Sequence, residues 1–319
     1  MFRSRLQRLA LIALGGLVLV LGFSRLADAM RHADAPAAPG SPDVLYDETF
    51  TVRAGAELAV DLGAEAVVVE TVSGRRARVR VEGTGRDAAA EFERRQFSAR
   101  ATNGGLEVRT DPPRRRAWSM RGRRDARFTV TVEVPRRFDA DIDVGSGSVT
   151  VASLDGDLDV ETGSGSVRLG DVSGGLSVDT GSGSIRAGGV GGDAALDTGS
   201  GSIRVGDVGG RLAVDTGSGG VTAGAVRGPV DVETGSGSAR VSASGRHGVQ
   251  VRTGSGSATV SVPRGSGWDV RLDGSAIVID DALRFRGQRE RRQARGEIGR
   301  GGPDLRVETG SGRIRIEAE

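Results

Sequence analysis

The 319-residue sequence contains no cysteine and no lysine, and it has only two histidines and one tyrosine. The lack of cysteine excludes disulfide scaffolds, cysteine-based zinc sites, cysteine nucleophiles and iron–sulfur clusters. The two histidines, His32 and His247, leave little room for a mechanism that needs a histidine base. Aromatic residues make up 3% of the chain, so a hydrophobic core must be built from small aliphatic side chains.

The charge balance gives no reason to expect a nucleic-acid partner. All 44 basic residues are arginine and 42 residues are acidic, which gives a net charge of +2. Because little titrates between the carboxylates and arginine, the pI of about 10.0 reflects a flat titration curve. Removal of residues 1–29 would leave 40 arginines and 41 acidic residues, a balance without a general attraction to polyphosphate.

The N-terminus has the pattern of an export signal. Three arginines precede an uncharged apolar run over residues 9–24, and Ala27-Asp28-Ala29 supplies small residues before Met30. A membrane span needs ~20 apolar residues, whereas a secretory signal needs ~7–15. The sequence therefore predicts either a cleaved signal peptide over residues 1–29 or a retained N-terminal membrane anchor, and membrane contact is expected only through residues 9–24 if the segment is uncleaved.

An internal repeat dominates the rest of the chain. Gly-Ser-Gly occurs nine times, and six copies follow one another at a spacing of 18 residues, starting at Gly145, Gly163, Gly181, Gly199, Gly217 and Gly235. Within each unit, apolar residues at the fifth and seventh places and at the fourteenth and sixteenth places alternate with polar ones, which predicts two short strands. The Gly-Ser-Gly and Gly-Gly steps mark bends, where glycine tolerates positive φ.

One unit of this kind cannot bury its own apolar face, but stacking on like neighbours at ~4.8 Å per coil buries it. We therefore predict an all-β fold, a single-stranded β-helix (β-solenoid) with 18-residue rungs. Its handedness stays open, with a right-handed coil favoured. A left-handed hexapeptide helix is disfavoured because the apolar places do not keep six-residue spacing. An antiparallel meander stays an alternative, although Asn-Gly and Asp-Gly hairpin turns are absent from the regular repeats.

Stacked coils would align like residues in columns. We expect a threonine ladder whose hydroxyls bond to a neighbouring coil: Thr162, Thr180, Thr198, Thr216, Thr234 and Thr253. We expect an outward acidic column: Glu161, Asp179, Asp197, Asp215 and Glu233. A second outward column is basic, across the Gly-Ser-Gly bend: Arg168, Arg186, Arg204 and Arg240. The two charged columns are expected to neutralise each other in part.

The flanks are expected to belong to the same body, with one short helix over residues 88–96. The predicted organisation is a flexible tether over 30–43 and a solenoid over 44–319, divided into degenerate N-terminal rungs (44–144), regular Gly-Ser-Gly rungs (145–275), a charged irregular insertion (276–303) and a terminal rung (304–319).

The Phe128–Pro135 strand ending in Val-Pro, the repeated Thr-Gly-Ser-Gly-Ser-(Val/Ile)-Arg units and the closing segment from Gly296 through Thr309-Gly-Ser-Gly-Arg-Ile resemble the bacterial putative-adhesin family. This is a β-strand-repeat domain of unknown function in envelope proteins, and the resemblance covers residues 45–319. It implies a β-solenoid in an exported protein. The family has no agreed catalytic or binding residues, so the resemblance assigns no site.

Two arginine clusters, in residues 114–127 and 284–300, are candidate contacts with anionic envelope polymers or lipid headgroups, and solvated loops are the alternative. The candidate binding residues are Arg114, Arg115, Arg116, Arg123, Arg124, Arg291 and Arg292. No metal ligand or cofactor site is predicted, because Gly191-Gly-Asp-Ala does not match the calcium-binding Gly-Gly-x-Gly-x-Asp repeat. His247 lies in a bend and is expected to be an exposed turn residue.

The function predicted from the sequence is a non-catalytic, adhesin-like or structural surface, exported to the periplasm, the cell envelope or the extracellular space. Its expected partners are an envelope polymer, a glycan or another protein surface, bound by contacts that repeat on each coil. One alternative is an envelope sensor or regulatory ectodomain retained by the N-terminal segment. Another is a carbohydrate-active enzyme, disfavoured because acidic residues recur by repeat and only Trp118, Trp268 and Tyr46 join phenylalanine as sugar-stacking aromatics.

Overall fold

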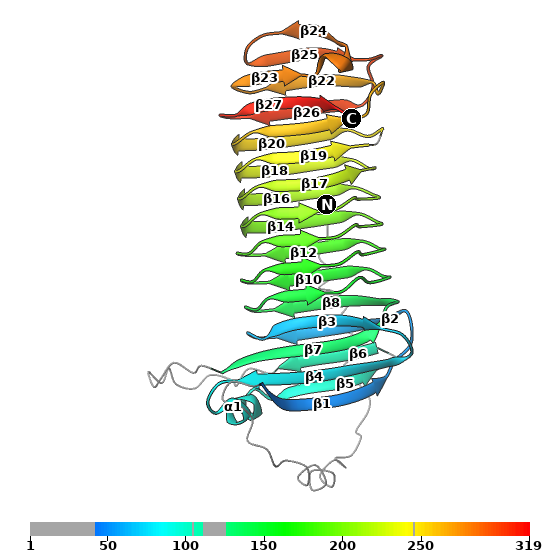
Figure 1. The fold of residues 1–319 in the computed structure, drawn as a ribbon, viewed down its shortest axis with the longest axis vertical. Helices are drawn as coiled ribbons and strands as arrows, with labels where there is room; N and C mark the ends of the chain where they lie inside the picture. Colours follow the sequence, from blue (N-terminus) through cyan, green and yellow to red (C-terminus); the bar gives the residue numbers. More distant parts are fainter. Residues whose placement is uncertain (1–41, 104, 111–125, 245) are drawn as a thin grey trace, which may run out of the picture. The chain divides into compact units, whose positions relative to one another are not determined.

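The computed structural model describes residues 42–103, 105–110, 126–244 and 246–319, and Pro42–Glu319 form one compact unit. Within this unit, β-coils stack along one axis and form two long sheets (Figure 1). The predicted signal or anchor segment lies outside the described residues, as does nearly all of the predicted tether; the first strand begins at Asp43.

The strand orders of the two sheets both start from the end of the stack that contains β1 and β5. Sheet A contains, in spatial order, β1 (Asp43–Thr51), β4 (Arg76–Thr84), β7 (Arg127–Pro135), β3 (Ala66–Val72), β9 (Val149–Val151), β11 (Val167–Leu169), β13 (Ile185–Ala187), β15 (Ile203–Val205), β17 (Val221–Val226), β19 (Ala239–Ala243), β21 (Ala258–Val262), β27 (Arg313–Ala318) and β23 (Ala276–Ile279). Sheet B contains β5 (Phe97–Thr102), β6 (Gly105–Thr110), β2 (Ala56–Leu62), β8 (Phe138–Val144), β10 (Leu158–Thr162), β12 (Leu176–Thr180), β14 (Ala194–Ser200), β16 (Leu212–Ser218), β18 (Val230–Ser236), β20 (Val249–Ser255), β26 (Asp304–Thr309), β22 (Trp268–Asp273), β25 (Gln293–Ile298) and β24 (Phe285–Arg289).

Each regular coil consists of one strand of sheet B followed by one strand of sheet A. Neighbouring coils pair in parallel and in register, so that Leu176 of β12 lies beside Leu158 of β10 and Ala194 of β14. This pairing confirms the predicted β-solenoid with 18-residue coils, and it shows that the antiparallel meander is wrong for the regular repeats. A third, very short side of each coil is held by parallel bridges at Leu154, Val172, Val190, Val208 and Val226.

The core lies between the two sheets and is continuous from one end of the stack to the other. It is made mainly of valine, leucine, isoleucine and alanine, in agreement with the scarcity of aromatic residues. Alternation places these side chains inward: in β16, Leu212, Val214 and Thr216 are buried while Asp215 is exposed. Trp268, in β22 near one end of the stack, is fully buried and donates its indole N–H to the Ser266 hydroxyl, 2.8 Å away.

The Gly-Ser-Gly bend is required by the neighbouring coil. A Cβ on Gly201 would lie 1.9 Å from the Gly183 carbonyl oxygen, so only glycine fits at this close approach. The same carbonyl accepts a hydrogen bond from the Thr198 hydroxyl at 3.0 Å. The bond recurs at the matching threonines and confirms the predicted ladder: Thr162, Thr180, Thr216, Thr234, Thr253 and, from the C-terminal segment, Thr309.

At both ends of the stack, the order of the coils in space differs from their order in the chain. The coil made by β2 and β3 lies between β6–β7 and β8–β9. At the other end, β26 and β27 insert between β20–β21 and β22–β23. The predicted terminal rung, 304–319, therefore carries the repeat motif but is not the last coil in space. Thr309 and the Gly-Ser-Gly after it align with Thr253 and the Gly-Ser-Gly that begins at Gly254, so this coil continues the register of β20.

Antiparallel strands close both ends. β1, β4 and β7 form one antiparallel set, and β5 pairs antiparallel with β6, so the region 44–144 is only partly made of degenerate coils. The predicted helix is present as α1 (Ala88–Arg94). Just after it, Arg95 pairs with the buried Glu65 carboxylate and stacks 4.5 Å from the centre of the Phe128 ring, which ties the segment after α1 to the first coils.

The region 276–303, predicted as irregular, contains β23, a short 3-10 helix over Asp281–Leu283 and the hairpin β24–β25. The hairpin extends sheet B by antiparallel pairing with β22. Sequence reasoning missed it because its residues are mostly exposed and the strand pattern of one apolar face is weak there.

Candidate binding surfaces

The outer face of sheet B carries a continuous ladder of carboxylates. In-register pairing aligns seven acidic residues on successive coils, called here the acidic ladder: Asp61, Asp143, Glu161, Asp179, Asp197, Asp215 and Glu233. All seven are exposed. The predicted acidic column is confirmed, and it extends two coils further, to Asp143 and Asp61, than the regular repeats indicated.

Arginines close the acidic ladder at both ends. Arg109 Nη2 lies 3.9 Å from Asp61 Oδ2, and Arg252 Nη1 lies 3.1 Å from Glu233 Oε2. The five carboxylates between them form no ion pair with any residue that the structure describes. The middle of the ladder is thus a run of like charges on adjacent strands, which are ~4.8 Å apart.

This crowding shifts the titration of the ladder. Partial burial, followed by the repulsion of neighbouring carboxylates, raises the pKa of Asp143, Glu161 and Asp197 above the ordinary values. For Asp197 the repelling groups are Asp179 and Asp215, the members of the ladder directly before and after it. The negative charges of the ladder therefore act on one another and leave this face of the protein ready to accept a positive partner.

The outer face of sheet A carries the opposite charge. Arg168, Arg186 and Arg204 align on β11, β13 and β15, and Thr222 separates them from Arg240. We call these four arginines the arginine column. All four are exposed.

The expectation that the two columns neutralise each other is wrong. No ion pair joins the arginine column to the acidic ladder among the residues with described positions. The physical reason is the fold: both columns point outward, but from different sheets that share one core, so the core separates them.

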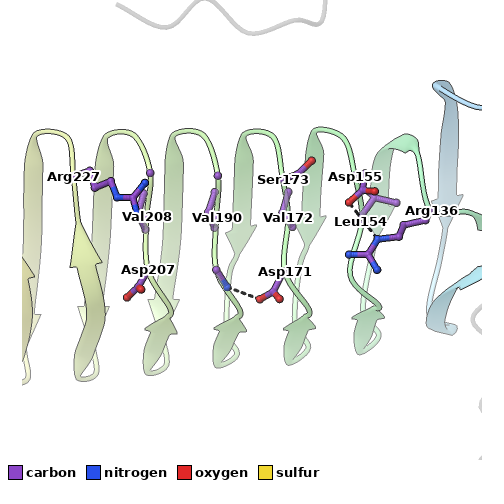
Figure 2. Close-up of a pocket in the computed structure, with 13 residues that line it drawn as sticks. Arg136, Leu154, Asp155, Asp171, Val172, Ser173, Val190, Asp207, Val208 and Arg227 are labelled. Carbon is purple, nitrogen blue, oxygen red and sulfur yellow. Dashed lines mark hydrogen bonds and ion pairs between the residues drawn. The ribbon is translucent and has the colours of Figure 1, made fainter.

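A groove of about 330 Å³ runs along the third side of the coils, across several rungs (Figure 2). The side chains of Asp171 and Asp207 line it, but each carboxylate already accepts a backbone N–H of the next coil, from Gly189 at 2.7 Å and from Ala225 at 2.8 Å. At one end, Arg136 pairs with Asp155 at 3.2 Å. The carboxylates of the groove thus serve the stacking of the coils, a role that the sequence analysis missed.

The predicted arginine clusters are only partly within the described residues. Arg114, Arg115, Arg116, Arg123 and Arg124 lie outside them. Arg291 and Arg292 are exposed and form the two-residue tip of the β24–β25 hairpin, where the Glu290 N–H donates to the Gln293 carbonyl at 2.8 Å. The structure thus presents the second cluster at the end of the coil stack.

Three further features bear on function: clusters of metal-ligating side chains, His247 and helices that could span a membrane. Within these residues no three His, Cys, Asp or Glu side chains gather as a metal site. His247 is exposed in the bend between β19 and β20, as predicted. No helix with described positions is long and apolar enough to cross a membrane.

A comparison with models of protein families identifies the family of this chain. The family model Toastrack DUF4097 matches residues 56–317. The chain belongs to the Toastrack family. The match covers the coils and most of both end caps of this Toastrack protein, and it agrees with the resemblance to a bacterial adhesin-like domain of unknown function.

Solved structures similar to this Toastrack protein come from several bacteria. A putative cell adhesion protein from Clostridium sporogenes has 11% identity and a TM-score of 0.24, over 88% of this chain and 100% of that chain. A putative adhesin from Bacteroides fragilis has 10% identity and a TM-score of 0.37, over 85% and 96%. A putative lipid binding protein from Parabacteroides distasonis has 9% identity and a TM-score of 0.31, also over 85% and 96%. No curated protein matches the chain.

Proposed function

We propose that this Toastrack protein is an exported, non-catalytic, adhesin-like module that contacts anionic polymers of the cell envelope or the extracellular matrix. One observation carries the proposal: the arginine-rich hairpin β24–β25 stands at the end of the coil stack, with Arg291 and Arg292 exposed at its tip. Neither side chain forms an ion pair with a residue of the described ranges.

The tip of the hairpin lies beside the outer coil, because the Gly274 N–H in the β22–β23 turn donates to the Arg292 carbonyl at 2.9 Å. Arg289 donates to the Ile277 carbonyl of β23 at 3.1 Å, which fastens the hairpin to that coil, and Arg286 donates to the Gly299 carbonyl just after β25, which holds the two hairpin strands together. Arg291, Arg292 and Arg295 stay exposed. Guanidinium groups bind phosphate and carboxylate through paired N–H donors, and several weak contacts on one polymer add up.

A non-catalytic role is supported by how the acidic residues are distributed. The carboxylates of the coils recur once per coil, in the acidic ladder and along the groove, and those of the groove are used by backbone N–H groups. Export is supported by the arginine-then-apolar pattern of residues 1–29. The arginines at 114–116, 123 and 124 remain part of the proposed polymer contact on the basis of sequence alone.

The proposal is tested by polymer binding to the full chain. Biolayer interferometry with alginate and with long-chain polyphosphate, at moderate ionic strength, should show binding that neutral dextran lacks. The double substitution Arg291→Glu and Arg292→Glu should weaken binding at least tenfold. The matched control is Arg75→Glu with Arg76→Glu, an exposed adjacent pair where the β3–β4 turn leads into β4, which makes the same charge change elsewhere.

Equal losses in the two double variants would mean that net charge alone drives binding, and the proposed site would be abandoned. Unchanged affinity in the Arg291/Arg292 variant, or no binding of either polyanion by the natural chain, would overturn the proposed function.

A further inference from the structure

The 18-residue unit carries opposite charges on opposite sides of the coil. Each of three consecutive units places one arginine on sheet A and one aspartate on sheet B, as Arg186 and Asp197 do in the unit that starts at Gly181. The repeat thus builds a basic outer face and an acidic outer face at the same time. Within one chain these faces cannot meet, because the shared core lies between them.

We propose that copies of this chain associate side by side, with the arginine column of one copy on the acidic ladder of the next. The partner is a second copy of this chain, because it supplies the complementary charge in the same geometry. The proposal concerns surfaces other than the β24–β25 hairpin, so it stands or falls independently of polymer binding.

The two faces match in spacing. Arg168, Arg186 and Arg204 are one coil apart, and so are Asp179, Asp197 and Asp215. Both repeats are set by the same parallel strand pairing, at ~4.8 Å per coil. Once one arginine meets one carboxylate, the next two pairs fall into register without any change of conformation.

The residues two positions away from the arginines, and from the facing aspartates, are small. Gly170, Gly188 and Gly206 lie two positions after the three consecutive arginines, immediately after β11, β13 and β15 end. On sheet B, Ser177, Ala195 and Ala213 lie two positions before Asp179, Asp197 and Asp215. Two such faces can approach until the guanidinium groups reach the carboxylates, since no bulky side chain at these positions holds them apart.

The association is expected to be weak and strongly dependent on salt. The arginine-bearing strands β11, β13 and β15 have 3 residues each, so the regular coils of sheet A offer a face of about 250 Å² per copy, from a strand rise of ~3.3 Å and a coil spacing of ~4.8 Å. A stable specific interface buries ~800 Å² per partner, so this contact falls in the transient class. Because a basic face meets an acidic face, the contact is heterologous (head-to-tail). The first copy keeps a free acidic face and the second keeps a free basic face. Further copies can therefore add at both sides, which gives open arrays.

Sedimentation velocity of the purified full chain tests the proposal. At ~0.01 M salt, where the Debye length is ~30 Å, the natural chain should form oligomers larger than dimers that grow with concentration, and at ~1 M salt it should be monomeric. The triple variant Arg168→Gln, Arg186→Gln, Arg204→Gln should stay monomeric at low salt. So should the triple variant Asp179→Asn, Asp197→Asn, Asp215→Asn. All six positions are exposed, and thermal unfolding confirms that each variant is folded.

Mixing the two triple variants provides the decisive result. One keeps the whole acidic ladder but only Arg240 of the arginine column, and the other keeps the whole arginine column but lacks the three central carboxylates, so the mixture should form mainly a one-to-one complex. A control with the same change of charge, Arg53→Gln, Arg75→Gln, Arg76→Gln, at exposed positions outside both charged columns, should associate like the natural chain. A natural chain that is monomeric at ~0.01 M salt, oligomers that survive in either triple variant, or a mixture that stays monomeric would each overturn the proposal.

Discussion

At the scale of single residues, the position of a residue within the 18-residue coil restricts which side chains fit there. Gly201 must be glycine because the Gly183 carbonyl occupies the place of a Cβ, and Thr198 stays buried because its hydroxyl donates to that same carbonyl. Asp171 reaches the Gly189 N–H, and its carboxylate fills the space that a side chain at Gly188 would need. Contacts with the neighbouring coil thus restrict the choice of polar and small residues, just as packing in the core restricts the choice of aliphatic residues.

A pair of neighbouring alanines in β14 tests which side of the strand faces the core. Ala194 is 2% exposed, whereas Ala195 is exposed on the outer face of sheet B. Ala194→Asp should destabilise the protein by several kcal/mol, about 3 or more, because a carboxylate would be buried without a partner. Ala195→Asp places the same charge in solvent and should cost less than about 1 kcal/mol. Chemical denaturation measures both, and equal destabilisation would contradict the burial assigned to β14.

The acidic ladder predicts an unusual dependence of stability on pH. The pKa of Asp197 is raised in the folded protein by burial and by Asp179 and Asp215, so the folded state binds more protons than the unfolded state just above pH 4. The contribution of Asp197 to stability therefore falls as the pH rises through the raised pKa, and it is regained on acidification. Asp197→Asn removes this charge and should raise stability at pH 7 by about 0.5 kcal/mol, a value reduced for exposure.

The measurement is the melting temperature across about pH 4 to 7, a range that spans the ordinary and the raised carboxyl pKa values. The Asp197→Asn variant should have a smaller decrease toward neutral pH than the natural chain. Asp281→Asn removes an exposed carboxylate away from the ladder and serves as the control. A steeper decrease in the Asp197 variant would show that the ladder does not repel itself as described.

At the scale of elements, the regular repeat was predictable from sequence because one pattern occurs many times. The alternation around Val167 and Leu176 predicted two strands per coil, and the structure has β11 and β12 there. The order of the end coils was not predictable, because β2 and β26 have the same alternating pattern as any inner strand. Which coil each one pairs with depends on long-range packing, which a local pattern does not contain.

The charged columns could likewise be predicted from the sequence only in part. The sequence predicted both charged columns and their places on either side of the Gly-Ser-Gly bend, but the expected partial neutralisation failed because the repeat pattern does not tell how far apart the outer faces of the two sheets lie. Asp61 and Asp143 were left out of the predicted column, although Leu58–Leu62 and Phe138–Val144 alternate as β10 does. Aligning these flanking strands on the repeat would have found them.

Deletion of one whole coil tests the element as the unit of construction. Removal of residues 199–216 joins Thr198 to Gly217, which begins the same Gly-Ser-Gly bend, so the register of every later strand is kept. Removal of only residues 199–207 destroys the alternation between sheets for all following coils. We expect the full-coil deletion to keep a cooperative melting transition and the half-coil deletion to lose it, as measured by circular dichroism. Equal damage from both deletions would contradict stacking in 18-residue coils.

At the scale of the whole molecule, the fate of residues 1–29 distinguishes a released surface protein from a retained ectodomain. The proposed export predicts that the mature protein begins at Met30, after the small residues Ala27 and Ala29. Mass spectrometry of the protein recovered from its native host would identify this terminus. An intact N-terminus in the membrane fraction would favour the sensor or regulatory alternative, and recovery from the cytoplasm with an intact N-terminus would contradict export.

The late insertion of β26 and β27 has a consequence for how the protein is made. Because β26 and β27 follow β22–β25 in the chain, the place between β20–β21 and β22–β23 can be filled only after the coils on both sides of it have been synthesised. A nascent chain can stack its central coils early, but it cannot close that part of its core until β26 and β27 emerge. A secretion channel that accepts only unfolded polypeptide would therefore have a longer time in which to engage the chain.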